Sequence, residues 1–571
     1  MAVVAGALAC FAIRDPDLGF HVATGRAIDA LGAVPTTNVL SFTCPDAAWW
    51  LHQWIPAWLF HRADLALGPA GIGLLKVAVV ALTFACVGLV VARRSSERAV
   101  AVIAVLLLPL AASPRFLERP LLFSKLGLAV LLLGLTRLPE PNADRATWFR
   151  FGALTVLPAA VLAAFHAGFV YAWLVALAVL AAELLTRGSR VRPLLLWLVA
   201  LVGGTALSLS LAHPFGARVL ALPFRFSLDA YWNAHLVEFR PIDWDPWLYP
   251  AFWLLILLSL ASLLFAARPR WTFDRVLATL LLVGFGGLVL RHQRAVYAFA
   301  LVAAFALPRV LTLVLSMAHA RVLRPAALAL AACAALRGVV VWYGSVQPGL
   351  GLDARAVPTA LLDFVATSGL PERAYVSDAW AGHWLWRFYP TRRSFYDNRI
   401  EAYPRDFFRE VYQSIRYGEP GWRERLQDYD VRLVVMRYAT PGERRFLEGR
   451  PGLRRLLLEA VDWRLVYWDD HGEVFVRRDV GLDACSRCGD FRSFDPDTAR
   501  PIVASPGQVQ GELEDVLARS GPSERAFVAL VRTALWAEDR PTAARWVVDG
   551  LRRLPESEAL LQLARALTGS R

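Results

Sequence analysis

The sequence predicts a polytopic α-helical membrane protein with about 11 membrane helices, followed by a small soluble α/β domain and a short α-helical tail. Of the 571 residues, 57% are hydrophobic and only 19% are charged, and the mean hydropathy is +0.43. A soluble chain of this length carries about 25% charged residues. The apolar residues also cluster, and most of them precede residue 345. Together these observations exclude a soluble enzyme, a disordered chain and a disulfide-framed miniprotein.

Apolar stretches define the first domain, residues 1–345. A helix that crosses the roughly 30 Å hydrocarbon layer needs about 20 residues, so the shorter stretches are expected to be sunken or partly re-entrant. The first stretch also lacks a basic start, which argues against a cleaved signal peptide. The stretches are 2–13, 70–92, 99–113, 121–136, 151–165, 169–186, 193–212, 250–267, 276–290, 295–316 and 325–343.

The density of arginine predicts the orientation of these helices. With residues 14–69 placed outside and the helices alternating, the inner loops hold 14 Arg in 43 residues and the outer loops hold 10 in 107. Positive charge is enriched in loops on the cytoplasmic side. We therefore expect the large loops 14–69 and 213–249, and everything after residue 343, to lie outside the cytoplasm.

The region after the membrane domain is expected to contain three parts. They are a soluble α/β domain over 346–480, a linker over 481–506 and helical hairpins over 507–571. In the α/β domain, strand-like and helical pieces alternate. The strand-like pieces are 374–377, 431–436, 464–468 and 474–477, and the helical ones are 359–368, 406–417 and 451–461.

The C-terminal tail is expected to form helices at 508–519, 523–537, 540–553 and 556–568. Residues 541–555 are similar to the second helix of a tetratricopeptide repeat with its closing proline, and a plain helical hairpin fits them equally well. A repeat of this kind would offer a surface for a protein partner.

The net charge of +13 does not indicate nucleic-acid binding, because the arginines are dispersed and no basic run alternates with aromatic residues. Only two of the cations are lysines, Lys76 and Lys125. The sequence contains no P-loop, GxGxxG, GxSxG or HExxH motif. It therefore gives no sign of nucleotide-driven work or of the common hydrolase classes.

Asp15 and Asp17 are the candidate catalytic residues. They lie in the segment Arg14-Asp-Pro-Asp-Leu-Gly-Phe-His21, directly after the first apolar stretch, and Pro16 turns the chain there. A carboxylate that is partly shielded from water can act as a general base or hold a divalent metal, so Mg²⁺ or Mn²⁺ at these two residues is the candidate cofactor. The alternative is an interfacial pair that caps a helix over residues 21–31.

Other polar residues of the outer loops are candidate substrate-binding groups. His52 and Gln53 stand in a Trp-rich segment, residues 49–58, which by itself would form an aromatic belt in the interface. Each of the others alone would be a contact to lipid headgroups. Together they supply what a lipid-linked phosphate and a hydroxyl acceptor need. They are His21, Arg119, His166, Glu238, Arg240, Arg291 and Arg294.

Cys485 and Cys488 form a lone CxxC motif in the linker. The chain has no second Cys pair, so zinc would need two further ligands. Outside the cytoplasm we expect a disulfide between them, and a redox-active pair is the less favoured alternative.

Taken in order, several motifs resemble the GT-C superfamily of membrane glycosyltransferases. More closely, they are similar to a group of bacterial GT-C-like proteins that begin with a D-x-D-x-x-x-H-x-x-x-G pattern, matched by Asp15, Asp17, His21 and Gly25. The resemblance covers residues 1–480, and helical repeats often end such chains. The later motifs are His52-Gln-Trp54, Arg119-Pro-Leu-Leu-Phe-Ser124, His213-Pro-Phe-Gly216, Glu238-Phe239, Ala381-Gly-His-Trp-Leu-Trp386 and Tyr396-Asp-Asn-Arg399.

The resemblance implies an inverting hexosyl or pentosyl transfer from a polyprenyl-phosphate-linked sugar to an envelope acceptor. It would take place at the periplasmic face of the bacterial inner membrane, with Asp15 or Asp17 as the base. The donor phosphate would meet arginines, with Arg119, Arg240, Arg291 and Arg294 as candidates. Two motifs depart from these relatives, since Gln53 stands where they have Glu and His213 replaces Asn. Gln53, the short first helix and the sparse acidic residues favour an alternative, a non-catalytic scaffold whose soluble tail recruits a cell-envelope partner.

Overall fold

The computed structural model describes residues 1–229, 231–232, 241, 245, 249–266, 272–315, 320–446, 448–483 and 485–569. The chain forms two compact units. The helical unit comprises Met1–Asp15, Thr24–Thr36 and Trp50–Asp353, and the C-terminal unit comprises Pro16–Ala23, Thr37–Trp49 and Ala354–Arg571. Two segments of the first outer loop thus pack with the C-terminal region, which the sequence pattern did not indicate.

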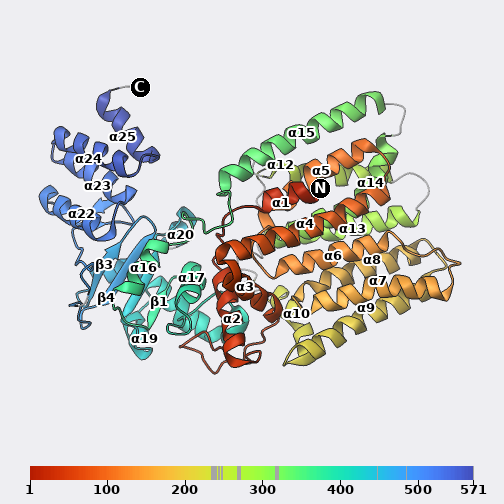
Figure 1. Ribbon diagram of the computed structural model, residues 1–571, viewed down its shortest axis with the longest axis horizontal. Helices are drawn as coiled ribbons and strands as arrows, with labels where there is room; N and C mark the ends of the chain where they lie inside the picture. The colour runs from red at the N-terminus through yellow and green to blue at the C-terminus, as the bar shows by residue number, and fades with distance from the viewer. Residues whose placement is uncertain are drawn as a thin grey trace. The chain divides into compact units, whose positions relative to one another are not determined.

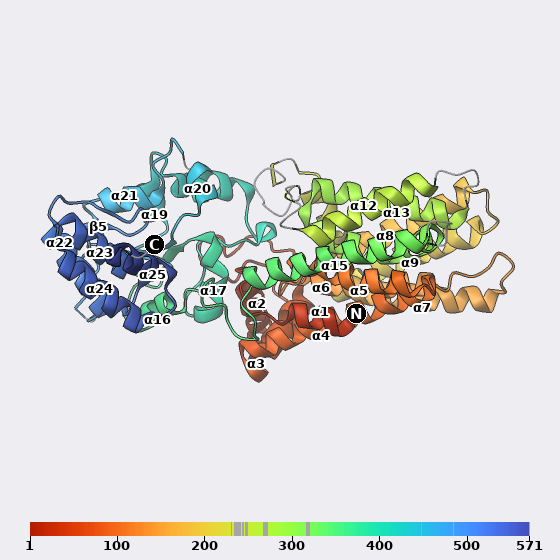
Figure 2. The same ribbon diagram turned by 90° about the horizontal axis from the view of Figure 1, so that it is seen from above.

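Long apolar helices make up most of the helical unit, and Figures 1 and 2 show α5, α12 and α15 side by side. Short 3₁₀ turns join several of them, namely η1 (Ser113–Arg115), η2 (Ala167–Phe169), η3 (Gly216–Ala221) and η5 (Gln293–Ala295). The helix α2 (Leu18–Leu31) has its first residues in the C-terminal unit. The other helices are α1 (Ala2–Ala9), α3 (Trp54–Leu67), α4 (Pro69–Arg94), α5 (Arg98–Ala112), α6 (Leu121–Leu135), α7 (Arg145–Ala163), α8 (Val170–Leu185), α9 (Val191–Ala212), α10 (Leu222–Ser227), α12 (Pro250–Ala266), α13 (Phe273–Arg291), α14 (Val296–Leu315) and α15 (Ala320–Ser345).

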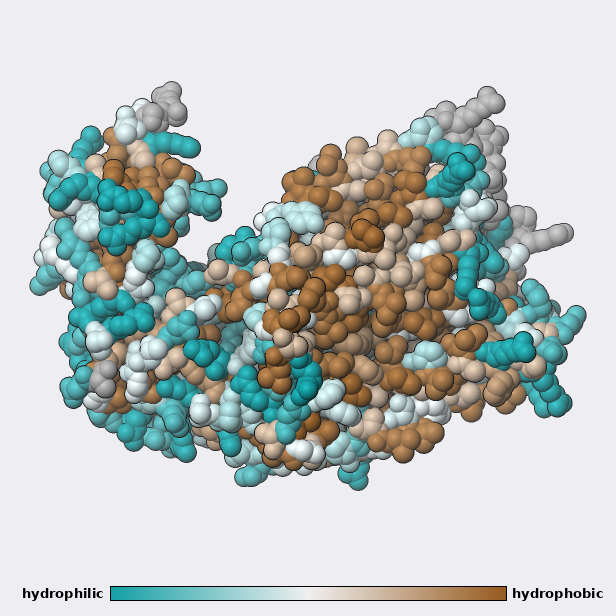
Figure 3. Space-filling model, in the orientation of Figure 1, coloured by the Kyte–Doolittle hydropathy of each residue, from teal (hydrophilic) through white to brown (hydrophobic). Residues whose placement is uncertain are grey.

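The protein is a multi-pass membrane protein. Among the described residues, seven helices are long and apolar enough to cross a bilayer, and α6 and α12 contain shorter apolar stretches. The expected number of 11 is therefore not reached by this measure. Figure 3 shows hydrophobic side chains covering much of the visible face of the helical unit. Exposed apolar residues such as Leu82 and Leu89 on α4 and Leu336 on α15 suit contact with lipid rather than water.

The first apolar stretch differs from its prediction as one helix over residues 2–13. The helix α1 ends at Ala9, and its eight residues are far too few to cross a bilayer. The chain then becomes extended: the backbone N–H of Ala12 donates to the carbonyl of Gln347 at 2.8 Å, and that of Ile13 to the carbonyl of Gly351 at 2.8 Å. The segment after α15 therefore satisfies the backbone groups that a longer helix would have satisfied internally.

The C-terminal unit contains the expected strands, in a four-stranded sheet with the order β1-β2-β4-β3. The strands β1 (Ala374–Val376) and β2 (Leu433–Arg437) are parallel, whereas β3 (Trp463–Trp468) and β4 (Gly472–Arg477) pair antiparallel. Strands β2 and β4 are also antiparallel. Apolar residues of the sheet, of α16 (Thr359–Thr367) and of α17 (Asp378–Phe388) form the core. The shorter elements are η6 (Ile400–Ala402), η7 (Phe407–Tyr412), α18 (Gln413–Tyr417), α19 (Trp422–Asp428), α20 (Pro441–Phe446) and α21 (Leu453–Glu459).

Helices also end the chain, close to the expected ranges. They are α22 (Pro506–Ser520), α23 (Glu524–Trp536), α24 (Arg540–Arg553) and α25 (Glu558–Thr568). Successive helices pack on one another, and side chains of Ser523, Asp539 and Ser557 cap three of them. In the preceding linker, which carries the two-residue strands β5 (Phe494–Asp495) and β6 (Arg500–Pro501), Cys485 and Cys488 form a disulfide.

Candidate functional site

Four cations gather in the helical unit, and we call Arg115, Arg119, Lys125 and Arg294 the cationic cluster. Arg115 ends η1, Arg119 lies in the turn before α6, Lys125 lies in the first turns of α6, and Arg294 lies in η5 between α13 and α14. Arg115 is close enough to Arg119 and Arg294 for electrostatic interaction, and Lys125 is close enough to Arg115 and Arg294. Like charges repel in a low-dielectric setting, so an anion would stabilise this arrangement.

Lys125 is the most constrained member of the cluster. Its side chain is 0% exposed, and its Nζ has no hydrogen-bond acceptor among the described residues. The ammonium lies 3.8 Å from the centroid of the Tyr171 ring, which gives it a cation–π contact. A ring face compensates only part of the loss of hydration of a buried ammonium. Lys125 is therefore suited to receive an anionic ligand.

Asp15 is held by a member of the cluster. Its carboxylate is 1% exposed, and the Arg119 guanidinium donates to both of its oxygens, with Nη2 lying 3.0 Å from Oδ1 and Nε bonded to Oδ2. Two parallel bonds of this kind fix the plane of an arginine. The carboxylate is shielded from water, and both of its oxygens are engaged. Asp15 therefore fixes the position of Arg119.

Next to this pair, Lys76 and Glu118 form a second buried ion pair. The Lys76 Nζ lies 2.5 Å from the Glu118 Oε1, and both side chains are 0% exposed. Lys76 also donates to the carbonyl of Phe11 at 2.8 Å. The pair thus connects α4, the turn after η1 and the extended segment after α1. The two charges of this pair compensate each other, and the pair holds these three segments together. The Glu118 carboxylate is therefore bonded to Lys76 and not to a member of the cationic cluster.

Histidines line the neighbouring region of the helical unit. The rings of His52 and His166 have centroids 5.5 Å apart, and the His166 Nδ1 lies 3.1 Å from the Ser124 Oγ. That Nδ1 also accepts from the backbone N–H of Gly168 at 3.0 Å. Burial lowers the pKa of His52 to about 4, with a contribution from the charge of Arg294, and burial lowers the pKa of His213 to about 4 as well. Both rings are therefore neutral at pH 7 and add polarity without charge.

Asp17 and His21 belong to the C-terminal unit. The Asn398 Nδ2 donates to the Asp17 Oδ1 at 2.9 Å, and His21 is 4% exposed on α2. The loop that carries Asn398 is fixed by a buried pair in which Arg399 donates to both oxygens of Asp397, at 2.6 and 2.7 Å. The Tyr396–Arg399 motif of the sequence thus positions Asn398, which in turn holds Asp17.

Apart from Asp17 and His21, the sequence-predicted residues fall into three groups. Asp15, Arg119, His52, His166 and Arg294 come together in the helical unit. Arg291, by contrast, is exposed at the end of α13, and Gln53 precedes α3 without capping it through its side chain. Glu238 and Arg240 lie outside the described residues.

Sequence reasoning missed Arg115, Lys125, Ser124 and Tyr171 as parts of this region. A signal for two of them was present. Arg115 stands four residues before Arg119 in the same short loop, and Lys125 is one of only two lysines in an arginine-rich chain. Neither Ser124 nor Tyr171 stands out by type or spacing, because their place depends on how α6 and α8 pack.

The described residues do not fit a divalent metal. They contain no group of three or more His, Cys, Asp or Glu side chains that could hold a metal ion. In addition, the Asp15 carboxylate is occupied by the Arg119 guanidinium, a cation that would repel a metal ion. The chemistry proposed below therefore includes no step through a metal.

Solved structures share the fold of this chain. The archaeal oligosaccharyltransferase AglB from Archaeoglobus fulgidus, in complex with an inhibitory peptide and a dolichol-phosphate, matches with a TM-score of 0.58 and 12% identity over 84% of this chain and 74% of that chain. ArnT from Cupriavidus metallidurans bound to undecaprenyl phosphate matches with a TM-score of 0.51 and 14% identity over 85% of this chain and 97% of that chain. The chain shares the fold of these two proteins.

The apo form of the Archaeoglobus fulgidus oligosaccharyltransferase gives a similar match, with a TM-score of 0.58 and 13% identity over 84% of this chain and 75% of that chain. No protein-family model and no curated protein sequence matches the chain. At such identities the likeness concerns the fold alone, so the chemistry must be argued from the residues of this chain itself.

Proposed function

We propose that the protein is a glycosyltransferase that moves a sugar from a polyprenyl-phosphate-linked donor to a hydroxyl of an envelope acceptor, at the periplasmic face of a bacterial inner membrane. The observation that carries this proposal is the buried Lys125 ammonium, which has no acceptor among the described residues and lies beside Arg115 and Arg294. A buried charge without a counter-charge is unfavourable. A phosphate offers several anionic oxygens and is a ligand that Lys and Arg bind well.

Two further points support this class of substrate. The cationic cluster lies among helices that suit a bilayer, so its ligand can be a membrane lipid. In addition, two solved structures with the same fold contain dolichol-phosphate and undecaprenyl phosphate. A polyprenyl phosphate combines the anionic group that the cluster needs with the chain that the membrane can hold.

The transfer proceeds as a single displacement in this proposal. The acceptor oxygen attacks the anomeric carbon on the face opposite the phosphate, and the bond between that carbon and the phosphate oxygen breaks. The electron pair of the broken bond stays on the polyprenyl phosphate, the acceptor proton passes to a carboxylate, and the anomeric configuration inverts. Cations held in place beforehand stabilise the negative charge that develops on the phosphate.

We assign the base to the acidic motif of the first outer loop, Asp15 or Asp17. Because both oxygens of Asp15 accept from Arg119, Asp15 also has a positioning role toward the phosphate. Substitution of Asp17 is therefore the cleaner test of proton transfer, since it leaves the Asp15–Arg119 pair intact.

A non-catalytic scaffold is the second candidate, and one observation favours it. The paired bonds between Arg119 and Asp15 give the first carboxylate of the motif a sufficient structural role. In that case the C-terminal helices α22–α25 would recruit an envelope partner. Asp17→Asn would then leave function unchanged, and truncation after Arg478 would abolish it.

The deciding experiment measures release of polyprenyl phosphate by the purified full chain from polyprenyl-phosphate sugars, with and without Mg²⁺ or Mn²⁺. We expect release by the wild type and loss of most of it in Asp17→Asn and in Lys125→Met. Arg218→Gln is the matched control, because Arg218 is an exposed cation in η3. Release that survives both substitutions would contradict the proposal. If no donor supports release and the wild type does not bind polyprenyl phosphate, the scaffold is favoured.

A further inference from the structure

The start of α2 packs against α17 within the C-terminal unit. The segment Pro16–Ala23 belongs to this unit, and it places Gly19, in the first turn of α2, against Gly382 in the middle of α17. A Cβ at Gly19 would overlap the carbonyl oxygen of Gly382, and a Cβ at Gly382 would overlap the carbonyl oxygen of Pro16. Only glycine fits at both positions, because the two backbones are in contact there. The contact therefore fixes the backbone on both sides of Asp17.

The loop between α17 and η6 is built to hold Asn398 in place. The residues on either side of Asn398 are Asp397 and Arg399, which form a buried ion pair. The Asp397 Oδ2 also accepts from the Ser394 hydroxyl at 2.7 Å and from the Tyr403 hydroxyl at 2.8 Å. Because both neighbours of Asn398 are anchored in this way, its amide extends from a rigid loop.

A second segment of the first outer loop stabilises the same loop. In the segment Thr37–Trp49, the Thr43 Oγ1 donates to the carbonyl of Phe395 at 2.6 Å. The Arg399 guanidinium lies 4.4 Å from the centroid of the Trp49 ring, which gives it a cation–π contact. Both segments of the first outer loop that belong to the C-terminal unit thus serve the loop after α17.

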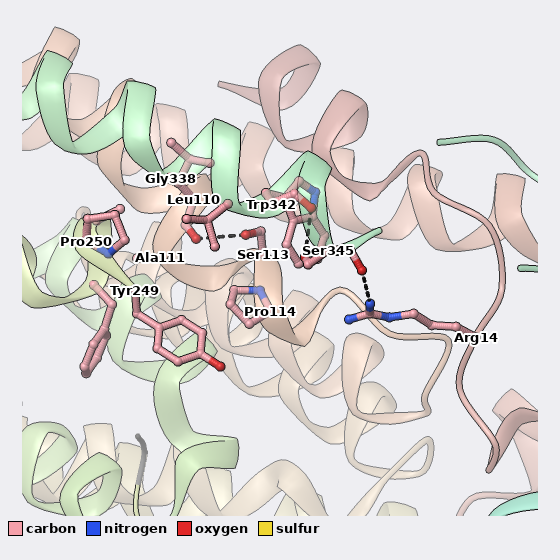
Figure 4. Close-up of a pocket in the computed structure, with 13 residues that line it drawn as sticks. Arg14, Leu110, Ala111, Ser113, Pro114, Tyr249, Pro250, Gly338, Trp342 and Ser345 are labelled. Atoms are coloured by element: carbon pink, nitrogen blue, oxygen red, sulfur yellow. Dashed lines mark hydrogen bonds between the residues drawn. The ribbon is translucent and has the colours of Figure 1, made fainter. Parts of the chain in front are cut away.

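The two residues before Pro16 belong to the helical unit, and their side chains are engaged there. Arg14 lies at the pocket drawn in Figure 4, where its Nη1 donates to the carbonyl of Ser345 at 2.7 Å. Asp15 is buried, and the Arg119 guanidinium donates to both of its oxygens. Hydrogen bonds from a cation already occupy the Asp15 carboxylate, which favours a structural role for this residue.

Asp17 has a different environment. It is half-exposed, and the Asn398 Nδ2 donates to its Oδ1 at 2.9 Å. An amide is neutral, so this bond orients the carboxylate without compensating its negative charge. A general base needs an open approach for the group that it deprotonates and a fixed direction of its lone pairs. The exposure of Asp17 supplies the first, and the hydrogen bond from Asn398 supplies the second.

We propose that Asn398 is a positioning residue, which holds the Asp17 carboxylate in the orientation in which Asp17 takes the proton of the acceptor hydroxyl. The inference rests on the proposed function and narrows its base from Asp15 or Asp17 to Asp17. It also gives the C-terminal unit a part in the transfer itself, since this unit supplies both the base and the group that orients it.

The test measures kcat and KM for release of polyprenyl phosphate by the purified full chain. Asn398→Ala should lower kcat by about 10- to 100-fold, the usual effect of losing a hydrogen bond to a charged group. The KM for the donor should stay within about twofold, because the lost interaction acts on proton transfer and not on donor binding. Asn142→Ala is the matched control, since Asn142 is exposed in the turn between α6 and α7.

Two further variants separate positioning from folding, and thermal unfolding compares each with the wild type. Asn398→Asp keeps the size of the side chain and replaces the donor with a negative charge, so kcat should fall at least as far as in Asn398→Ala. Wild-type kcat in Asn398→Asp would overturn the proposal. The double variant Asn398→Ala with Asp17→Asn should lose no more activity than Asp17→Asn alone, because Asn398 acts through Asp17. Losses that multiply would show that Asn398 acts elsewhere and contradict the proposal.

The outcomes separate this inference from the proposed function. Release that is lost in Asp17→Asn and unchanged in Asn398→Ala would overturn the positioning role and leave the transferase proposal standing. A rise in KM with kcat unchanged would assign Asn398 to substrate binding and would overturn the positioning role as well. No release from any donor and no binding of polyprenyl phosphate by the wild type would overturn both proposals.

Discussion

The two lysines of the chain are buried in opposite ways. Lys76 on α4 and Lys125 on α6 are both 0% exposed. Lys76 is bonded to the Glu118 carboxylate and to the carbonyl of Phe11, and its Nζ lies 3.4 Å from the centroid of the Phe11 ring. Lys125 has the Tyr171 ring and two neighbouring arginines, and no acceptor among the described residues.

This difference shows how one type of residue can serve the fold in one place and a ligand in another. The partners of Lys76 come from the chain itself, so its region is complete as folded. Lys125 has two arginines near it and no acceptor for its Nζ among the described residues, so in our proposal the donor phosphate supplies one. Stability and binding should therefore respond to the two lysines in opposite ways.

The largest effect is expected at the ion pair between Lys76 and Glu118. Lys76→Met leaves the Glu118 carboxylate buried without its cation and should lower the free energy of unfolding by about 3–5 kcal/mol. Thermal unfolding of the purified protein in detergent measures this. The double variant Lys76→Met with Glu118→Leu removes both charges and should recover most of the loss. If the single variant is as stable as the wild type, the pair does not hold these segments together.

The second prediction concerns the other lysine. Lys125→Met removes a buried charge that has no acceptor among the described residues, so the ligand-free protein should be as stable as the wild type or more stable. Its affinity for polyprenyl phosphate should nevertheless fall about 10- to 100-fold, as expected for loss of a hydrogen bond between charged groups. The ligand-induced shift in the unfolding temperature measures both quantities. A destabilised variant that still binds the lipid would reverse the comparison.

The third prediction uses His213, which lies near His52. The pKa of buried His213 is about 4 when folded, below its ordinary value of 6.5, so the unfolded chain binds more protons between these two values. Stability from this group is thus present above about pH 6.5 and is lost as the pH falls toward 4, by about 1.4 kcal/mol at pH 5.5.

His213→Asn should therefore flatten the loss of stability between pH 7.5 and pH 5.5. Thermal unfolding at the two pH values, compared with the wild type, measures the change. Asn keeps a polar side chain at this position but does not titrate. An equal drop in both proteins would show that other groups cause the acid sensitivity.

The smallest effect is expected at Tyr171. Tyr171→Leu removes the ring face from the Lys125 ammonium and should weaken polyprenyl phosphate binding by about 2- to 5-fold, the size of an ordinary cation–π contact. Tyr171→Phe keeps the ring and should bind like the wild type. Equal losses in both variants would indicate that the hydroxyl, and not the ring, acts in this region.

Local pattern predicted most of the elements and about half of the site. Alternation of strand-like and helical pieces placed all four strands of the main sheet and the four C-terminal helices, because those signals lie within each segment. The end of α1 at Ala9 was missed because residues 10–13 pair with a segment more than 330 residues later in the chain. Asp15, Arg119 and Arg294 were found by type and place, whereas Lys125 was noted only as one of two lysines.

The sequence by itself determined that the chain is a multi-pass membrane protein with a mixed α/β region and a helical end, because hydropathy and periodicity are properties of each segment. Only the tertiary structure decided which charges meet. Arg119 reaches Asp15 across 104 residues, and Lys76 reaches Glu118 across 42. Pairing of charges depends on where distant helix ends come together, and the physical reason is that no local pattern of residues encodes that distance. For the same reason the sequence could not show that one buried lysine is paired with a carboxylate and that the other has no acceptor among the described residues.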